Sequence, residues 1–211
     1  MRRLAGVRIG VDLDNTIVCY DRLLHTLAVA RGFADDDVPA TKLAVRDHLR
    51  RCGREDAWTA LQGEAYGVRM GDALAFPGCS EALAALREQG AELFLVSHRT
   101  RAPYAGPPAD LHQEARNWLE RHGLWGDGLP FGSRHVFLET TRAEKCHRIE
   151  SLRCVVFIDD LPEVFVAPEF PAAVERVLFD PEGRHADAPG MRRIGSWPAI
   201  LDQLRQASRP L

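Results

Sequence analysis

The sequence predicts an α/β fold in which a parallel sheet carries helices on both faces and a small α-helical domain is inserted into the chain. Three observations predict it. Hydrophobic strand-like runs alternate with amphipathic helical segments from residue 77 onward. Three strand-like runs end in polar residues, and the stretch from residue 18 to 76 has a helical pattern throughout. Strands that are separated by helices form parallel sheets with right-handed crossovers.

The first 76 residues contain one expected strand and three expected helices. Residues 7–11 are a short β-prone run that stops at an acidic pair. Hydrophobic positions in residues 23–28 suit a helix that ends near Gly32, and Pro39 is a suitable start for a second helix. Trp58 and Leu61 would line one face of a third helix, which Gly67 can end. We therefore expect a core domain of residues 1–17 and 77–211, and a helical domain of residues 18–76.

From residue 77 the expected elements alternate between helix and strand. Ser80 can cap a helix that runs through Gln89, and residues 93–96 then form a buried strand that leads into Ser97. A loop rich in Pro and Gly precedes a helix at residues 111–119, whose hydrophobic positions share one face. The remaining expected elements are strands at 136–138, 155–158 and 177–179, a short helix around Lys145, and a closing helix at 197–204.

The composition is that of an ordinary globular protein of 211 residues, with 45% hydrophobic residues, 27% charged residues and a net charge of −3. No basic segment is large enough to indicate nucleic-acid binding, and no hydrophobic run approaches the roughly 18 residues of a membrane span. Arg8 and Asp12 interrupt the first apolar run, so we expect no signal peptide. The five cysteines lack metal-binding spacing, and we expect them to be free thiols, mostly buried, in a cytoplasmic protein.

Three expected strands end in side chains that can do chemistry. Asp12 and Asp14 follow the first strand, Ser97 follows the second, and Asp159 with Asp160 follows a later one. In an open parallel sheet the carboxyl ends of the strands meet at one crevice. Carboxylate oxygens are hard ligands, and Mg²⁺ needs only a few of them because it keeps several waters. The sequence therefore predicts a magnesium site at this edge of the sheet.

Four motifs in order resemble those of phosphatases of the haloacid-dehalogenase (HAD) superfamily. Asp12-Leu13-Asp14-Asn15-Thr16 resembles the first motif, D-x-D-x-T, and Ser97 at a strand end resembles the second. Lys145 fits the third motif. Asp159 and Glu163, four positions apart, fit the fourth. The resemblance covers about residues 7 to 200 and implies a Rossmann-like, HAD-type core with a type-one (C1) helical cap that closes over the site.

The resemblance also implies a role for each residue. Asp12 would attack phosphorus and form an aspartyl-phosphate, while Asp14 would protonate the leaving oxygen and then activate water. Ser97 and Lys145 would hold phosphoryl oxygens. Mg²⁺ would lie between Asp12, the Asp14 carbonyl and Asp159. Alternatively Asp160 would take the place of Asp159 as metal ligand, and Glu163 would orient Lys145 or a metal-bound water.

Positions 98 to 101 depart from the family pattern. His98 follows Ser97 where Asn is frequent in the family. The resemblance implies that position 98 helps to bind phosphate. Arg99, or His98, is a candidate to recognise a second polar or anionic group of the substrate, since an arginine fork suits a carboxylate or phosphate. The alternative is that Arg99 and Arg101 pair with surface carboxylates and contribute little energy.

The second carboxylate, Asp14, selects the reaction, because a dehalogenase releases halide and needs no proton donor. We therefore expect Mg²⁺-dependent hydrolysis of a small phosphomonoester, such as a sugar phosphate, polyol phosphate or nucleoside monophosphate. The expected partner is this small molecule, with no nucleic acid and no membrane. Two alternatives are a phosphomutase that uses the same aspartyl-phosphate and a catalytically weak regulatory protein that binds phosphate.

Overall fold

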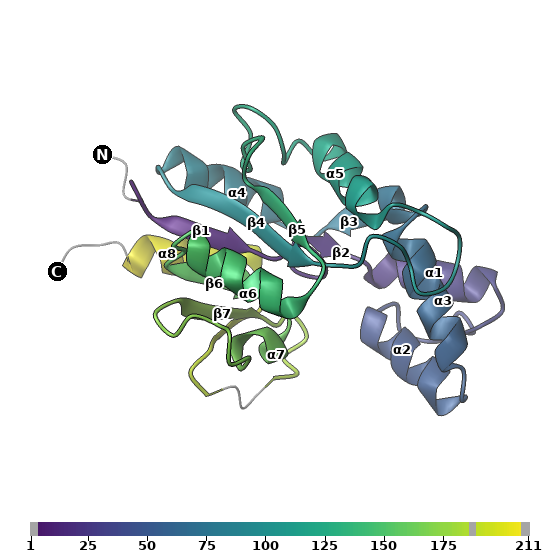
Figure 1. Cartoon of the computed structure of the whole chain (residues 1–211). Helices are drawn as coiled ribbons and strands as arrows, with labels where there is room; N and C mark the ends of the chain where they lie inside the picture. Colours follow the sequence, from purple (N-terminus) through teal and green to yellow (C-terminus); the bar gives the residue numbers. More distant parts are fainter. Residues whose placement is uncertain (1–3, 186–188, 208–211) are drawn as a thin grey trace. The chain divides into compact units, whose positions relative to one another are not determined.

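A computed structural model describes residues 4–185 and 189–207 of the chain. Its main feature is a six-stranded sheet with the order β5-β4-β1-β6-β7-β8 (Figure 1). Every pair of neighbouring strands is parallel, which confirms the predicted fold class. The strands are β1 (Arg8–Val11), β4 (Glu92–His98), β5 (Val136–Glu139), β6 (Val156–Asp159), β7 (Glu175–Phe179) and β8 (Arg192–Ile194).

The strand β1 lies inside the sheet between β4 and β6. Gly10 is in register with Phe94 on one side and Phe157 on the other. A Cβ atom at Gly10 would lie 2.4 Å from Cδ2 of Phe157, so only glycine leaves room for this buried ring. Phe157 belongs to a hydrophobic cluster with Phe94, Ile149 and Phe165, which anchors the centre of the sheet.

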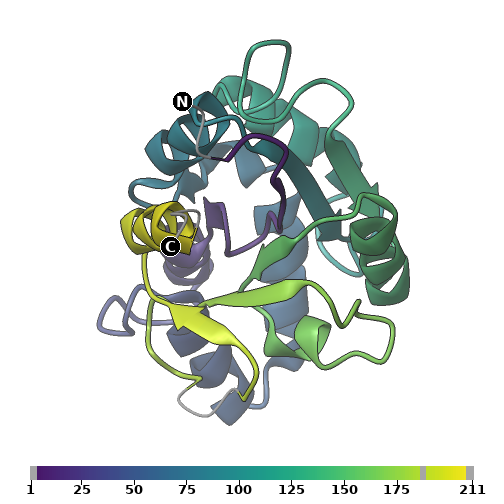
Figure 2. The ribbon, with the colours of Figure 1, turned by 90° about the vertical axis from the view of Figure 1, so that its left-hand side faces the viewer.

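Helices cover both faces of the sheet, as predicted. Figures 1 and 2 show α4 (Cys79–Glu88) and α8 (Trp197–Ala207) on one side and α6 (Arg142–Ser151) on the other. Period-two alternation in the strands explains this arrangement, because successive side chains point to opposite faces. Phe94 and Val96 of β4 join the cluster that contains Ile149 of α6. Phe179 of β7 instead lies 6.1 Å from Trp197 of α8, measured between ring centroids.

The chain forms two compact units. Unit 1 contains residues 1–17, 75–99 and 123–211, and unit 2 contains residues 18–74 and 100–122. Unit 2 contains most of the helical domain that we expected at residues 18–76, together with α5. The role of this domain as a cap over the site stays a prediction. The helices of unit 2 are α1 (Asp21–Ala30), α2 (Lys42–Arg51), α3 (Glu55–Tyr66), the 3₁₀ helix η1 (Met70–Asp72) and α5 (Leu111–Arg121).

Several local expectations were wrong. The stretch 18–76 is not wholly helical, because β2 (Val18–Cys19) and β3 (Leu74–Ala75) form a second, two-stranded sheet. The second helix begins at Lys42 rather than Pro39, since the Thr41 hydroxyl accepts a hydrogen bond from the Ala44 amide at 3.1 Å and caps it. Ser80 does not cap α4, because the helix already begins at Cys79 and its N-cap position is Gly78, with φ of 75°.

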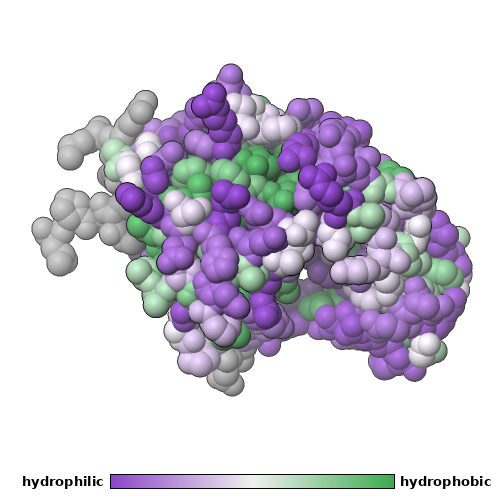
Figure 3. Space-filling view, in the orientation of Figure 1, coloured by the Kyte–Doolittle hydropathy of each residue, from purple (hydrophilic) through white to green (hydrophobic). Residues whose placement is uncertain are grey.

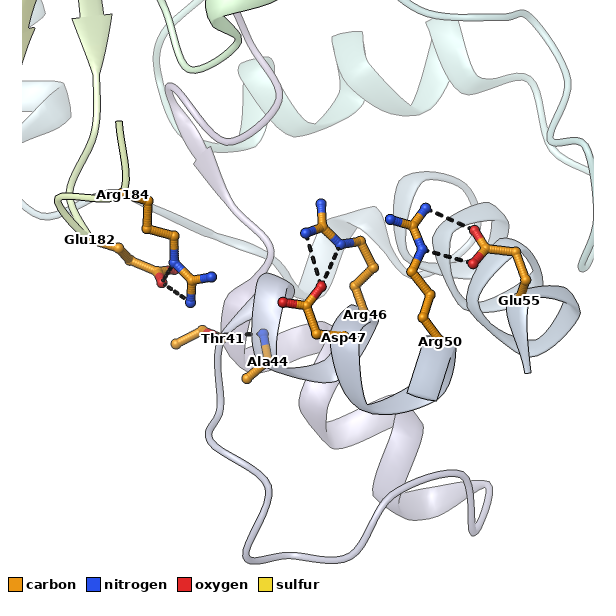
Figure 4. A network of polar contacts seen from close by, with 8 residues as sticks. All are labelled: Thr41, Ala44, Arg46, Asp47, Arg50, Glu55, Glu182 and Arg184. Carbon is orange, nitrogen blue, oxygen red and sulfur yellow. Dashed lines mark hydrogen bonds and ion pairs between the residues drawn. The ribbon is translucent and has the colours of Figure 1, made fainter. Parts of the chain in front are cut away.

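The surface carries scattered hydrophobic residues among many charged ones. Hydrophilic residues predominate on the face in Figure 3, with smaller hydrophobic areas between them. Within unit 2, Arg46 pairs with Asp47 and Arg50 makes two hydrogen bonds to Glu55, at 2.7 and 2.9 Å (Figure 4). Figure 4 also shows the ion pair between Glu182 and Arg184 of unit 1. In the described part of the chain, no helix has both the length and the apolar character of a membrane span.

Candidate active site

The carboxyl ends of β1, β4 and β6 bring the predicted residues to one edge of the sheet. Asp12 follows β1 directly, Ser97 and His98 end β4, and Asp159 ends β6. The strand order reverses at β1, since the chain continues to β4 and β5 on one side and to β6, β7 and β8 on the other. Ligand sites in open α/β sheets lie at such a reversal. All of these residues belong to unit 1.

A buried ammonium group lies between two of the carboxylates. Lys145 Nζ is 2.5 Å from Asp12 Oδ1 and 2.6 Å from Asp159 Oδ2, and the lysine side chain is 0% exposed. The start of α6 fixes its position. The Thr141 hydroxyl accepts from the Glu144 amide and the Glu144 carboxylate accepts from the Thr141 amide, which is a reciprocal capping box. Lys145 is the next residue of the helix and points into the site.

The charges of this group do not balance. Burial alone would lower the pKa of Lys145, but Asp12 and Asp159 outweigh it and raise that pKa above its usual value, so the lysine is charged. Burial raises the pKa of Asp159 to about 7, and the negative charge of Asp12 adds to this effect, although Lys145 and the Leu161 amide oppose it. One ammonium therefore compensates two buried carboxylates only in part.

The donor set fits a hard divalent cation. Asp12, Asp159 and Asp160 each offer one carboxylate oxygen, and these three atoms lie within 4.8 Å of one another. Oxygen donors without sulfur or imidazole suit Mg²⁺ rather than zinc. A cation there would also supply the positive charge that Lys145 alone does not provide. The backbone carbonyl of Asp14 stays a predicted ligand, and so does the choice between Asp159 and Asp160.

Hydrogen bonds to β6, within the loop and to α8 hold the loop after β1 in place. Asn15 has φ of 59°, which is the left-handed conformation that asparagine tolerates. The Asp12 amide donates to the Ile158 carbonyl at 2.9 Å, and the buried Thr16 hydroxyl lies 3.5 Å from Asp12 Oδ2. Trp197 Nε1 donates to the Thr16 carbonyl at 2.9 Å across 181 residues. Sequence reasoning missed Trp197 as an anchor of this loop, because no local motif links the two positions.

The end of β4 places a small hydroxyl and an imidazole in the site. Ser97 is 1% exposed. Burial lowers the pKa of His98, and the charge of Lys145 lowers it further, while Asp12 and Asp14 oppose this shift. His98 Nδ1 is buried, and it has no hydrogen-bond partner among the described residues. Phosphate binding by Ser97, His98 and Lys145 stays a prediction.

The two arginines after β4 have different surroundings. The Arg99 side chain is only 3% exposed, and its Nη1 lies 3.7 Å from Asp14 Oδ1. Arg101 is 69% exposed and lies 3.9 Å from Asp110 Oδ2 in unit 2. A pairing between surface groups therefore describes Arg101 but not Arg99, whose partner is one of the predicted site carboxylates. Substrate recognition by Arg99 stays a prediction.

Glu163 occupies a different position from the other acidic residues. It is exposed on the short helix α7 (Pro162–Phe165), and no hydrogen bond or ion pair of its side chain occurs within residues 4–185 and 189–207. In this arrangement Lys145 is held by Asp12 and Asp159 instead. The suggested action of Glu163 on Lys145 or on a metal-bound water stays a prediction.

Comparison with known proteins finds similarity in structure but not in sequence. No family model and no curated protein matches the sequence. A HAD-superfamily hydrolase from Ehrlichia chaffeensis has a TM-score of 0.56 at 13% identity, covering 96% of this chain and 97% of that one. A structure described as a predicted phosphoglycolate phosphatase, from Haemophilus somnus, has a TM-score of 0.54 at 14% identity, covering 95% and 98%. A dehalogenase has a TM-score of 0.51 at 13% identity, covering 95% and 98%. The chain therefore has the fold of the haloacid-dehalogenase superfamily.

Proposed function

We propose that this chain is a HAD-superfamily phosphatase that hydrolyses a small phosphomonoester through an aspartyl-phosphate on Asp12. The observation that carries the proposal is the buried group in which Lys145 contacts Asp12 and Asp159, with Asp160 close enough to share a cation. An anionic carboxylate can approach an anionic phosphate only where positive charge cancels their repulsion. Lys145 supplies part of this positive charge, and a cation held by the three carboxylates would supply the rest.

The proposed reaction has two steps. Asp12 forms a bond to phosphorus while the bond from phosphorus to the leaving oxygen breaks, and Asp14 gives its proton to that oxygen. Water then attacks the aspartyl-phosphate, Asp14 takes a proton from this water, and phosphate leaves with the Asp12 carboxylate restored. Lys145, which is protonated, holds Asp12 in place and balances the negative charge of the transferred group.

Asp12, Asp159 and Asp160 would hold Mg²⁺, which supplies charge neutralisation for the phosphoryl oxygens when bound. Activity is expected to disappear in excess chelator and to return with Mg²⁺. Ca²⁺ is expected not to restore it, since its larger and looser coordination misplaces the nucleophile. Full activity in excess chelator would contradict the metal requirement.

Asp14 favours cleavage of a phosphoester bond over cleavage of a carbon–halogen bond. It lies on the Arg99 side of the site and is 16% exposed, so a substrate oxygen can reach it. The similarity to the predicted phosphoglycolate phosphatase supports this reading, although a dehalogenase shares the fold as well. The substrate we propose is a small soluble molecule, and the five free cysteines favour a cytoplasmic location.

The direct test is a phosphate-release screen of the purified chain against a few dozen small phosphate esters with Mg²⁺. Asp12→Asn is the matched control, because it keeps the side-chain shape and removes the nucleophile. We expect release from at least one ester by the natural chain and at least a thousandfold less by the variant. Isomerisation of a sugar phosphate without free phosphate would indicate a mutase instead. Tight ester binding without turnover would indicate a regulatory protein.

A further inference from the structure

We infer that Arg99 is a positioning residue for Asp14, rather than a contact for a remote part of the substrate. The inference rests on the proposed function and adds a residue to its acid–base step. The observations that carry it are the burial of the Arg99 guanidinium, the 3.7 Å from its Nη1 to Asp14 Oδ1, and the engagement of Lys145 elsewhere.

The backbone fixes where the Arg99 side chain begins. Ser97 and His98 are in register with Leu138 and Glu139 of β5. The Arg99 amide donates to the Glu139 carbonyl at 2.8 Å, so the sheet pairing continues one residue past the end of β4. The Arg99 backbone is therefore held by sheet pairing at the same edge that carries Asp12.

The two cations of the site contact different carboxylates. Lys145 contacts Asp12 and Asp159 at 2.5 and 2.6 Å. Arg99 pairs with Asp14. A buried guanidinium is unfavourable unless a carboxylate compensates it. The pairing therefore stabilises Arg99 and, by the same attraction, limits the orientations of the Asp14 carboxylate.

Burial also favours this role over recognition of a remote substrate group. Only 3% of the Arg99 side chain is exposed, which leaves little guanidinium surface for a substrate group remote from phosphorus. Arg101, two residues later, is 69% exposed and provides the contrast of a solvated arginine. A residue that acts through Asp14 affects proton transfer, whereas a residue that binds substrate affects affinity. The two roles thus predict different kinetic changes.

The kinetic test uses Arg99→Met, Arg99→Lys and the control Arg101→Met with three probes. The probes are 4-nitrophenyl phosphate, whose leaving group needs little protonation, glycerol 2-phosphate, and 2-phosphoglycolate, which adds a carboxylate. For Arg99→Met we expect kcat/KM to fall about tenfold on both alkyl esters and less than twofold on the aryl ester, because proton donation matters only for the alkyl oxygens. Arg99→Lys should recover part of the loss, and Arg101→Met should match the natural chain.

Two kinetic results would overturn the inference. A rise in KM confined to 2-phosphoglycolate would assign Arg99 to substrate recognition. Equal losses of kcat/KM on all three probes would assign it to the phosphoryl group or to the local fold.

A second measurement needs no activity. Urea unfolding of the natural chain, Arg99→Met, Asp14→Asn and the double variant forms a cycle that measures their coupling. We expect the midpoint shifts to be non-additive, with Arg99→Met shifting the Asp14→Asn chain much less than the natural one. Additive shifts would overturn the pairing. A chain without phosphatase activity would contradict the proposed function, while this cycle would still decide on Arg99 and Asp14.

Discussion

At the scale of single residues, Lys145 is central to the site, because its ammonium group contacts both buried carboxylates, Asp12 and Asp159. The sequence predicted it from its place in a motif and from the scarcity of lysine, since Lys42 and Lys145 are the only two in the chain. It did not predict the contact with Asp12 across 133 residues, because a helix position does not specify how the helix docks on the sheet.

We expect Lys145→Met to lower the free energy of unfolding of the metal-free chain by about 3 kcal/mol, since it leaves Asp12 and Asp159 buried without their cation. Urea unfolding at neutral pH measures this loss. Lys42→Met is the control, because Lys42 is partly exposed at the start of α2, and we expect this substitution to change stability by about 1 kcal/mol or less. A Lys145→Met chain as stable as the natural one would show that Lys145 does not stabilise the buried Asp12 and Asp159 carboxylates.

The cysteines show where composition alone was insufficient. All five are free, as predicted, and Cys79, Cys146 and Cys154 are buried, but Cys52 is exposed at the end of α2 and Cys19 is only partly buried. Burial raises the pKa of Cys154 to about 12 and raises the pKa of Cys79 and Cys146 as well. The sequence could not distinguish the buried cysteines from the exposed one, because a cysteine is compatible with both environments.

We expect iodoacetamide to label Cys52 first at pH 7.5, with Cys79, Cys146 and Cys154 protected until the chain unfolds. Peptide mass spectrometry over a time course measures the order, and labelling in urea provides the reference in which all five react. Labelling of Cys146 or Cys154 at the rate of Cys52 would contradict the packing described for the hydrophobic cluster.

At the scale of elements, segments of four or more residues with a hydrophobic pattern were predicted well, and strands of two or three residues were not. The strands β1, β4, β6 and β7 and the helices α3, α5 and α8 lie close to their expected ranges, since each has several hydrophobic residues on one face. The strands β2, β3 and β8 have two or three residues. Segments that short contain less than two periods of any pattern, so tertiary pairing rather than sequence defines them.

The packing of α3 in unit 2 depends on one glycine. A Cβ atom at Gly63 would lie 1.8 Å from the Ala105 carbonyl oxygen, because the loop before α5 lies against this helix. We expect Gly63→Ala to lower the free energy of unfolding by about 2 kcal/mol, although alanine is the better helix former by about 1 kcal/mol. Gln62→Ala, one position earlier in α3, should change it little. A Gly63→Ala chain more stable than the natural one would show that the loop does not contact α3.

At the scale of the whole chain, the order of motifs and the alternation of strands were enough to predict the parallel sheet and the edge where its polar residues meet. The principle that strand ends converge at a reversal of strand order connects Asp12, Ser97 and Asp159, which are far apart in sequence. The contacts that refine the site were not predictable. The hydrogen bond from Trp197 and the pairing of Arg99 with Asp14 depend on how helices and side chains pack at that edge of the sheet.

The proposed function depends on phosphorylation of Asp12 during turnover. This step is tested by mixing the chain with excess substrate and Mg²⁺, stopping the reaction with acid within milliseconds, and measuring the intact and peptide masses. We expect a mass increase of one phosphoryl group on the peptide that contains Asp12, and no such increase in Asp12→Asn. Turnover without this adduct, or an adduct on a different residue, would contradict it.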